Sequence, residues 1–213
     1  MASDVNHPLF ARFFTWLSEK MEPEFGPFRS ELVSGLTGRV LEVGAGNGMN
    51  FAHYGDGATE VVALEPEAYM REKAEDSAAK VGPKITIVDG NALSLPFDDA
   101  SFDHVVTCMV LCSIDDQVAA LREAARVLRP GGRLHFFEHV RGKTRGKARV
   151  QDIADRSRIW PAIAGGCNGS RDTAASIEAA GFEFSELRDE TVGVKWGHTS
   201  PHVIGCASPH TSS

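Results

Sequence analysis

The sequence of 213 residues lacks the features that mark membrane, exported and metal-binding proteins. No apolar run approaches the roughly 18 residues of a membrane-spanning helix, and the N-terminus lacks the basic start and apolar stretch of an export signal. The cysteines form no CxxC pair and have no matching cluster of histidines, which argues against disulfides and zinc sites: Cys108, Cys112, Cys167 and Cys206. We therefore expect a cytoplasmic protein with reduced thiols, no metal and no membrane partner.

Positive charge is also scarce. The chain has 22 Lys and Arg against 29 Asp and Glu, a formal net charge of -7, which opposes binding to nucleic acids. Basic residues do alternate between Arg141 and Arg149, but no aromatic side chains stand among them to stack on bases. We interpret that stretch as a solvated loop and expect a small molecule, rather than a nucleic acid, as the partner. The composition leaves open whether the chain is a monomer or a homodimer.

What the sequence does contain is an alternation of apolar strands and amphipathic helices. Phe13, Leu17 and Met21 recur at helical spacing within residues 8–22, and the prolines at 23 and 27 predict that this helix breaks there. We expect strands over 40–43, 61–65, 84–88, 102–108, 133–138, 182–188 and 202–207, and helices over 67–80, after Asp115 and Asp116, and over 171–180. Such alternation predicts an α/β fold with a doubly wound parallel sheet. We place one domain at 31–208, with a helical cap at 1–30 and a polar tail at 209–213.

The most informative stretch is a strand that runs into three glycines. The strand over 40–43 is followed by Gly44, Gly46 and Gly48, and glycines let a backbone turn sharply and approach a ligand closely. Glu65 lies 19 residues after Gly46, at the end of a second apolar strand. An acid at that spacing can accept both hydroxyls of a ribose, so the pattern predicts a nucleoside site.

The glycine spacing separates two classes of nucleoside cofactor. The dinucleotide fingerprint G-x-G-x-x-G needs a glycine at position 49, where this chain has Met49, and it serves a pyrophosphate. The spacing G-x-G-x-G is that of S-adenosylmethionine sites. A tight turn above Glu42 suits the ammonium and carboxylate of that cofactor, so a dehydrogenase is a remote alternative.

Ligands of open α/β sheets bind beyond the carboxyl ends of the strands, which makes the residues just past each expected strand the candidates. We assign the methionine end of the cofactor to Glu42, Gly44, Gly46, Asn47, Gly48 and Asn50, the ribose to Glu65 and Pro66, the adenine edge to Asn91, Ala92 and Leu93, and the lining of the cofactor and substrate entrance to Cys108, Met109 and Leu111. His139 is a candidate base because histidine titrates near neutral pH. Structural alternatives stay open: a solvated acid at Glu65, a turn residue at Asn91, and packing roles for the cysteines and His139.

Several segments together resemble a known family. Val40 to Gly48, Leu95-Pro96-Phe97, Phe102-Asp103 and Val127 to Gly132 are similar to class I S-adenosylmethionine-dependent methyltransferases of the ubiquinone and menaquinone type. A narrower resemblance, to the alkyl-thiol S-methyltransferase branch, depends on Val110 to Ser113, Glu138-His139-Val140, Trp160, Gly166-Cys167, Arg171-Asp172-Thr173, Lys195-Trp196 and Pro201 to Gly205. It implies a Rossmann-like, seven-stranded methyltransferase sheet with one antiparallel strand and an N-terminal helical lid. We expect a soluble relative without the membrane anchor of the animal enzymes.

The resemblance implies S-methylation of a small thiol, such as hydrogen sulfide, a xenobiotic thiol or a natural-product dithiol. S-adenosyl-L-methionine would be the methyl donor and S-adenosyl-L-homocysteine the product. Deprotonating a thiol with a pKa of about 8.5 costs only about 2 kcal/mol at neutral pH, and His139 is the expected base. The expected acceptor-binding residues are Phe13, Leu111, Arg171, Trp196 and His202. The alternatives are O-, N- or C-methylation of a small aromatic or quinol, and a module that binds S-adenosylmethionine without catalysis.

Overall fold

A mixed β-sheet forms the centre of the molecule. The computed structural model describes residues 8–81, 85–142, 146, 149, 151–153, 167–193 and 199–210. Its strands are β1 (Gly38–Val43), β2 (Ala58–Leu64), β3 (Ile85–Val88), β4 (Phe102–Cys108), β5 (Leu128–His139), β6 (Phe182–Gly193) and β7 (Thr199–Pro209). In this described part of the chain they form one seven-stranded sheet in the order β3-β2-β1-β4-β5-β7-β6. Only β7 runs antiparallel to its neighbours in this sheet of described strands, which confirms the predicted fold.

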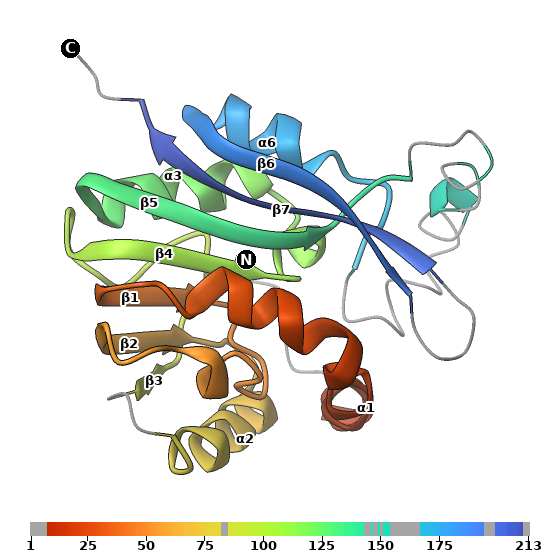
Figure 1. Ribbon diagram of the computed structural model, residues 1–213, viewed down its shortest axis with the longest axis horizontal. Helices are drawn as coiled ribbons and strands as arrows, with labels where there is room; N and C mark the ends of the chain where they lie inside the picture. The colour runs from red at the N-terminus through yellow and green to blue at the C-terminus, as the bar shows by residue number, and fades with distance from the viewer. Residues whose placement is uncertain are drawn as a thin grey trace.

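Helices cover both faces of this sheet. They are α1 (Pro8–Val33), α2 (Ala68–Ala78), α3 (Gln117–Val127) and α6 (Thr173–Ala179), with short 3₁₀ turns η1 (Phe51–His53) and η2 (Leu111–Ser113). Figure 1 shows α1 in front of the sheet and α3 and α6 behind it. Aspartates cap two of the helices. The side chain of Asp116 accepts from the Ala119 N–H at 2.9 Å, as expected, and that of Asp172 accepts from the Ala175 N–H at 3.1 Å.

Alternate residues of the strands feed two hydrophobic cores. In β1, Leu41 and Val43 belong to the core under α3 and α6, whereas Val40 belongs to the core under α1, with Phe25 and Leu32 of that helix. This alternation is the period of two that a strand imposes on its side chains. Where both faces are buried, the strands are largely apolar, as in residues 61–64 of β2, whereas the edge strand β6 is mostly exposed and polar.

The predicted break in the first helix is wrong. α1 continues through Pro23 and Pro27 to Val33, although each proline removes one backbone hydrogen bond. Both prolines are exposed, so the carbonyls that they leave unpaired can face water, while Phe25 on the opposite side is buried. The helix bends along its length (Figure 1), as prolines cause.

Several strands are longer than the sequence indicated, and β5 and β7 change the predicted boundaries most. β5 begins at Leu128, directly after α3, so Pro130 to Gly132 lie in the strand rather than between helix and strand. β7 reaches Pro209, which pairs with Phe182 and lies within the expected polar tail. Among the helices described, none combines the length and apolar character needed to cross a membrane.

Candidate functional site

The glycine turn lies at the carboxyl end of β1, between β2 and β4. The Gly44 and Ala45 N–H groups both donate to the Leu64 carbonyl, at 2.8 and 3.1 Å, which fixes the turn to the end of β2. Gly44, Gly46 and Gly48 have φ angles of 70°, 56° and 78°, a region that disfavours residues with a side chain. A Cβ on Gly46 would meet nothing within 4 Å, whereas one on Gly44 would overlap Val110. Gly46 therefore presents bare backbone to open space, as close approach of a ligand requires.

Glu65 lies against this turn. Its Oε2 accepts from the Gly46 N–H at 2.9 Å, and its Oε1 accepts from the Glu67 N–H at 3.0 Å. The side chain is 7% exposed, and burial raises its pKa. The alternative of a solvated acid is therefore wrong. A carboxylate offers about four lone-pair positions, so Glu65 keeps acceptor capacity for hydroxyl groups, beside the half-buried Pro66.

A buried polar network supports the turn from below. Glu42 accepts from Asn50 Nδ2 at 2.9 Å and from the Tyr54 hydroxyl at 2.8 Å, and burial raises the pKa of Glu42 to about 7. Asn47 Nδ2 donates to Ser18 Oγ of α1 at 3.1 Å. The predicted methionine-end residues are thus brought together, and α1 contacts them directly.

Arg29 of α1 completes the network and was missed in the sequence. Its Nη1 donates to Asn50 Oδ1 at 2.9 Å and to Cys108 Sγ at 3.4 Å. One signal could have identified it: Arg29 follows Phe25 by four residues and precedes Leu32 by three, which places a charged residue on the apolar face of the helix.

The residues proposed for the adenine edge lie in the loop after β3. Asn91 is exposed, and its Oδ1 accepts from the Leu93 N–H at 2.9 Å, the geometry of an Asx turn. Ala92 packs against the core, while Leu93 is 42% exposed. Asn91 thus shapes the loop, and its amide nitrogen is the group left to meet a ligand.

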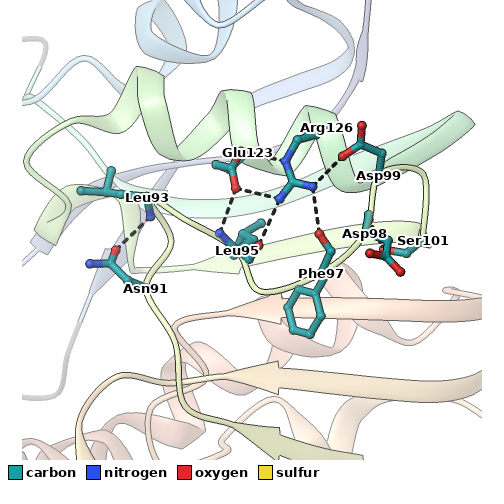
Figure 2. A network of polar contacts seen from close by, with 9 residues as sticks. All are labelled: Asn91, Leu93, Leu95, Phe97, Asp98, Asp99, Ser101, Glu123 and Arg126. Atoms are coloured by element: carbon teal, nitrogen blue, oxygen red, sulfur yellow. Dashed lines mark hydrogen bonds and ion pairs between the residues drawn. The ribbon is translucent and has the colours of Figure 1, made fainter.

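Arg126 of α3 holds the rest of that loop (Figure 2). It donates to the carbonyls of Leu95 and Phe97 at 3.1 and 2.8 Å and to Asp99 Oδ1 at 2.7 Å. Glu123 accepts from Arg126 and also from the Leu95 N–H at 2.9 Å. The Leu-Pro-Phe segment is therefore fixed by side chains from a later helix.

The turn after β4 is shaped by a buried carboxyl group from β5. Met109 has a φ of 55°, and its N–H donates to the Phe137 carbonyl at 2.7 Å. Glu138, fully buried, accepts from the Val110 and Leu111 N–H groups at 3.3 and 3.1 Å. Burial raises the pKa of Glu138 to about 8, so the group is mainly neutral at pH 7. Leu111 is itself buried, 1% exposed.

His139 follows Glu138 and is half-buried. Its Nδ1 lies 3.6 Å from Cys167 Sγ, and Cys167 also shares a hydrogen bond with Cys112. The Asn168 N–H donates to the Cys112 carbonyl at 2.9 Å, which holds the two segments together. Two thiols and an imidazole therefore form a cluster beyond the ends of β4 and β5.

The remaining predicted acceptor residues are not all gathered at this cluster. His202 is 2% exposed, stacks on Phe137 with 4.9 Å between centroids, and lies 5.4 Å from the His139 ring; burial lowers its pKa to about 3. Arg171 pairs with Asp115 at 3.2 Å. Phe13 is 52% exposed on α1. Trp196 lies outside the described residues.

Sequence comparisons identify relatives of the whole chain. A family model described as a methyltransferase domain matches residues 41–136. Thiol S-methyltransferase TMT1B of Mus musculus is 30% identical over 205 residues, which cover 93% of this chain and 82% of the relative. Thiol S-methyltransferase TMT1A of Homo sapiens is 30% identical over 205 residues, which cover 92% of this chain and 82% of the relative. The demethylmenaquinone methyltransferase of Renibacterium salmoninarum is 37% identical over 130 residues, which cover 59% of this chain and 51% of the relative.

A solved structure agrees with these matches at the level of the fold. An S-adenosylmethionine-dependent methyltransferase of Thermotoga maritima superposes with a TM-score of 0.65 at 21% identity, covering 92% of this chain and 97% of that one. At this identity the similarity concerns the fold, over almost the whole of both chains.

Proposed function

This chain belongs to the class I S-adenosylmethionine-dependent methyltransferases, and we propose that it is a thiol S-methyltransferase acting on a small molecule. One observation carries the proposal. The likeness to thiol S-methyltransferases spans 93% of the chain, whereas the general methyltransferase domain ends at residue 136. The extra part includes His139, Cys167 and the last two strands, and we assign the acceptor to this part of the chain. We propose small thiols and natural-product dithiols as the acceptor class.

The residues present fit the cofactor. S-adenosylmethionine, when bound, supplies an activated methyl group and leaves as S-adenosylhomocysteine. The buried Glu65 can accept the ribose hydroxyls beside Pro66, and the open side of Gly46 can admit the amino acid end. We assign the other contacts as the sequence indicates: Glu42, Gly44, Asn47, Gly48 and Asn50 at the methionine end, Asn91, Ala92 and Leu93 at the adenine, and Cys108 and Met109 beside the reactive end.

For the acceptor, we propose that His139 takes the proton from the thiol. A thiolate is the nucleophilic form, and an imidazole is a suitable base near neutral pH. The contact between Cys167 and Nδ1 orients the ring. Leu111 and Arg171 are the proposed walls of the acceptor pocket, together with Phe13 and Trp196, while the buried His202 supports the His139 ring from behind.

The experiment that tests the proposal measures S-adenosylhomocysteine formation with a panel of small thiols, dithiols, phenols, quinols and amines. We expect turnover on thiols only. His139→Gln should lower kcat/KM at least 10-fold at pH 7 and much less at pH 9, where more of the thiol ionises without help. Activity of His139→Gln equal to that of the parent enzyme at pH 7 would contradict the role of His139. Cofactor binding without turnover on any acceptor would contradict the proposed activity.

A second candidate is methylation of a quinol or small aromatic. The match to a demethylmenaquinone methyltransferase, at 37% identity, favours it, although that match covers 59% of this chain. Turnover on quinols or phenols without turnover on thiols would establish this candidate instead.

A further inference from the structure

Arg29 is a charged side chain buried at the cofactor end of the sheet. It is 6% exposed, and its Nη1 reaches Asn50 of the glycine turn and Cys108 at the end of β4. A buried guanidinium requires anionic or polar partners, since removing its charge from water is costly. The partners of Arg29 therefore indicate what this position is built to bind.

The carboxylates near Arg29 leave its charge only partly compensated. Glu22 Oε2 lies 3.2 Å from Arg29 Nε, but neither of these buried atoms makes a hydrogen bond. The other oxygen of Glu22 lies 2.7 Å from His53 Nε2. Glu42 is the next carboxyl group, and burial raises its pKa to about 7, so it carries only part of a negative charge at neutral pH. The guanidinium thus keeps capacity for a further anion.

The position of Arg29 along the crevice suggests which anion. Glu65 directly follows β2 (Ala58–Leu64), and the sheet order β2-β1-β4 places Cys108 on the other side of the glycine turn. A ligand with its ribose at Glu65 and its chain over Gly46 extends toward β4. Its far end carries an α-carboxylate, and arginine binds carboxylates through charge-assisted hydrogen bonds.

We propose that Arg29 binds the α-carboxylate of the cofactor's methionine end and thereby ties α1 to the bound cofactor. Ser18 contacts Asn47 from the same helix, and Thr15 Oγ1 lies 3.6 Å from Met70 Sδ of α2. Ser18 and Arg29 of α1 therefore both contact residues of the glycine turn, Asn47 and Asn50, and Arg29 contributes the charge. The proposal depends on the cofactor class and not on the acceptor, so it can hold even if thiols prove not to be substrates.

The test is calorimetric binding of S-adenosylhomocysteine and of its decarboxylated analogue, in which hydrogen replaces the carboxylate. The parent protein should bind the analogue about 10- to 100-fold more weakly, as for loss of a hydrogen bond to a charged group. Arg29→Gln should bind S-adenosylhomocysteine more weakly by a similar factor and should barely distinguish the two ligands. Lys20→Gln, an exposed change on the same helix, should retain the full discrimination.

Two results would overturn the proposal. Equal affinity of the parent protein for both ligands would mean that the carboxylate is not recognised, whatever the variants do. Equal weakening of both ligands by Arg29→Gln would mean that the arginine acts only through the packing of α1. If Arg29→Gln does not fold, Arg29→Lys provides the same comparison: it keeps a positive charge with fewer donors and should show discrimination reduced several-fold, and unchanged discrimination would again contradict the assignment.

Discussion

The glycines of the turn differ in how much they contribute to stability and to cofactor affinity, and single substitutions can separate the two effects. Gly46→Ala places a methyl group in open space, so its cost to folding is the left-handed backbone alone, about 1–2 kcal/mol. That methyl group points to where the cofactor lies in our assignment, so affinity for S-adenosylhomocysteine should fall at least 10-fold. Urea unfolding and calorimetric binding measure the two effects.

Gly48→Ala is the matched comparison. Its Cβ would lie 2.5 Å from Phe51 Cε2, inside a packed core, and overpacking adds about 1–3 kcal/mol to the backbone cost. We expect the larger loss of stability from this variant and the smaller change in affinity while it remains folded. Gly35→Ala, with no atom within 4 Å and no positive φ, should be close to neutral in both. Unchanged affinity in Gly46→Ala would place the ligand elsewhere.

Cys167 allows the orientation of His139 to be tested apart from its chemistry. Its Sγ lies 3.6 Å from His139 Nδ1, and loss of one hydrogen bond costs about 1 kcal/mol. Cys167→Ala should therefore lower kcat/KM for a thiol about 3- to 10-fold, while Cys167→Ser, which keeps a hydroxyl group, should lose less. The pH profile of kcat/KM should shift in Cys167→Ala, whereas the affinity for S-adenosylhomocysteine should not change.

Cys206→Ala serves as the control for Cys167→Ala, because Cys206 is a buried thiol on β7 that contacts His135 instead. Its pH profile should match that of the parent enzyme. If Cys167→Ala also matches the parent, the thiol has a packing role only.

At the scale of elements, α3 controls the loop that we assign to the adenine. Arg126→Met removes the donors that bind the Leu95 and Phe97 carbonyls, so these carbonyls lose their hydrogen bonds within the protein. We expect a loss of stability of about 1–3 kcal/mol and a several-fold weaker binding of S-adenosylhomocysteine. Arg122→Met changes an exposed arginine on the same helix and should alter neither. Tight binding retained in Arg126→Met would show that the loop keeps its shape without the arginine.

The elements that sequence predicted well are those specified by neighbouring residues. β4 has the predicted bounds, Phe102–Cys108, and the aspartate caps precede α3 and α6 because capping involves residues three apart. The break at Pro23 was wrong because packing of Phe25 and Arg29 outweighs the local effect of proline. The placement of Glu65 near the glycine turn was predicted from its spacing after Gly46 at the end of the second apolar strand.

What sequence could not supply are contacts between distant segments. Arg29 and Cys108 are 79 residues apart, and Arg126 and Leu95 are 31 apart. Glu138 illustrates the difficulty best, because its partners are backbone N–H groups 27 and 28 residues away. A backbone partner leaves no pattern of residue types in a sequence, so the support of the turn after β4 was not predictable.

At the scale of the whole molecule, buried titratable groups on the sheet set the pH dependence of stability. Burial lowers the pKa of His135 to about 4 and of His202 to about 3. In the unfolded chain each of these histidines becomes protonated below about pH 6.5, whereas in the folded protein it stays neutral. Each therefore lowers the free energy of unfolding as the pH falls below 6.5. Burial raises the pKa of Glu42 to about 7 and of Glu138 to about 8. Above about pH 4.5 each of these glutamates is ionised in the unfolded chain but still protonated in the folded protein. Each therefore lowers the free energy of unfolding as the pH rises toward its folded pKa.

Between pH 4.5 and 6.5 the two histidines and the two glutamates have opposite effects on the free energy of unfolding. Each group changes it by about 1.4 kcal/mol per pH unit, so the effects cancel. The free energy of unfolding should therefore be nearly level there and fall by about 2 kcal/mol from pH 6.5 to 8, where only the glutamates still titrate. Urea unfolding across pH 4 to 9 measures the curve. Glu138→Gln should remove most of the fall above pH 6.5, and His202→Gln should make stability rise, rather than stay level, as the pH drops from 6.5 to 4.5. His210→Gln changes an exposed histidine and should run parallel to the parent protein; a parallel curve for His202→Gln as well would mean that burial of that ring does not govern its protonation.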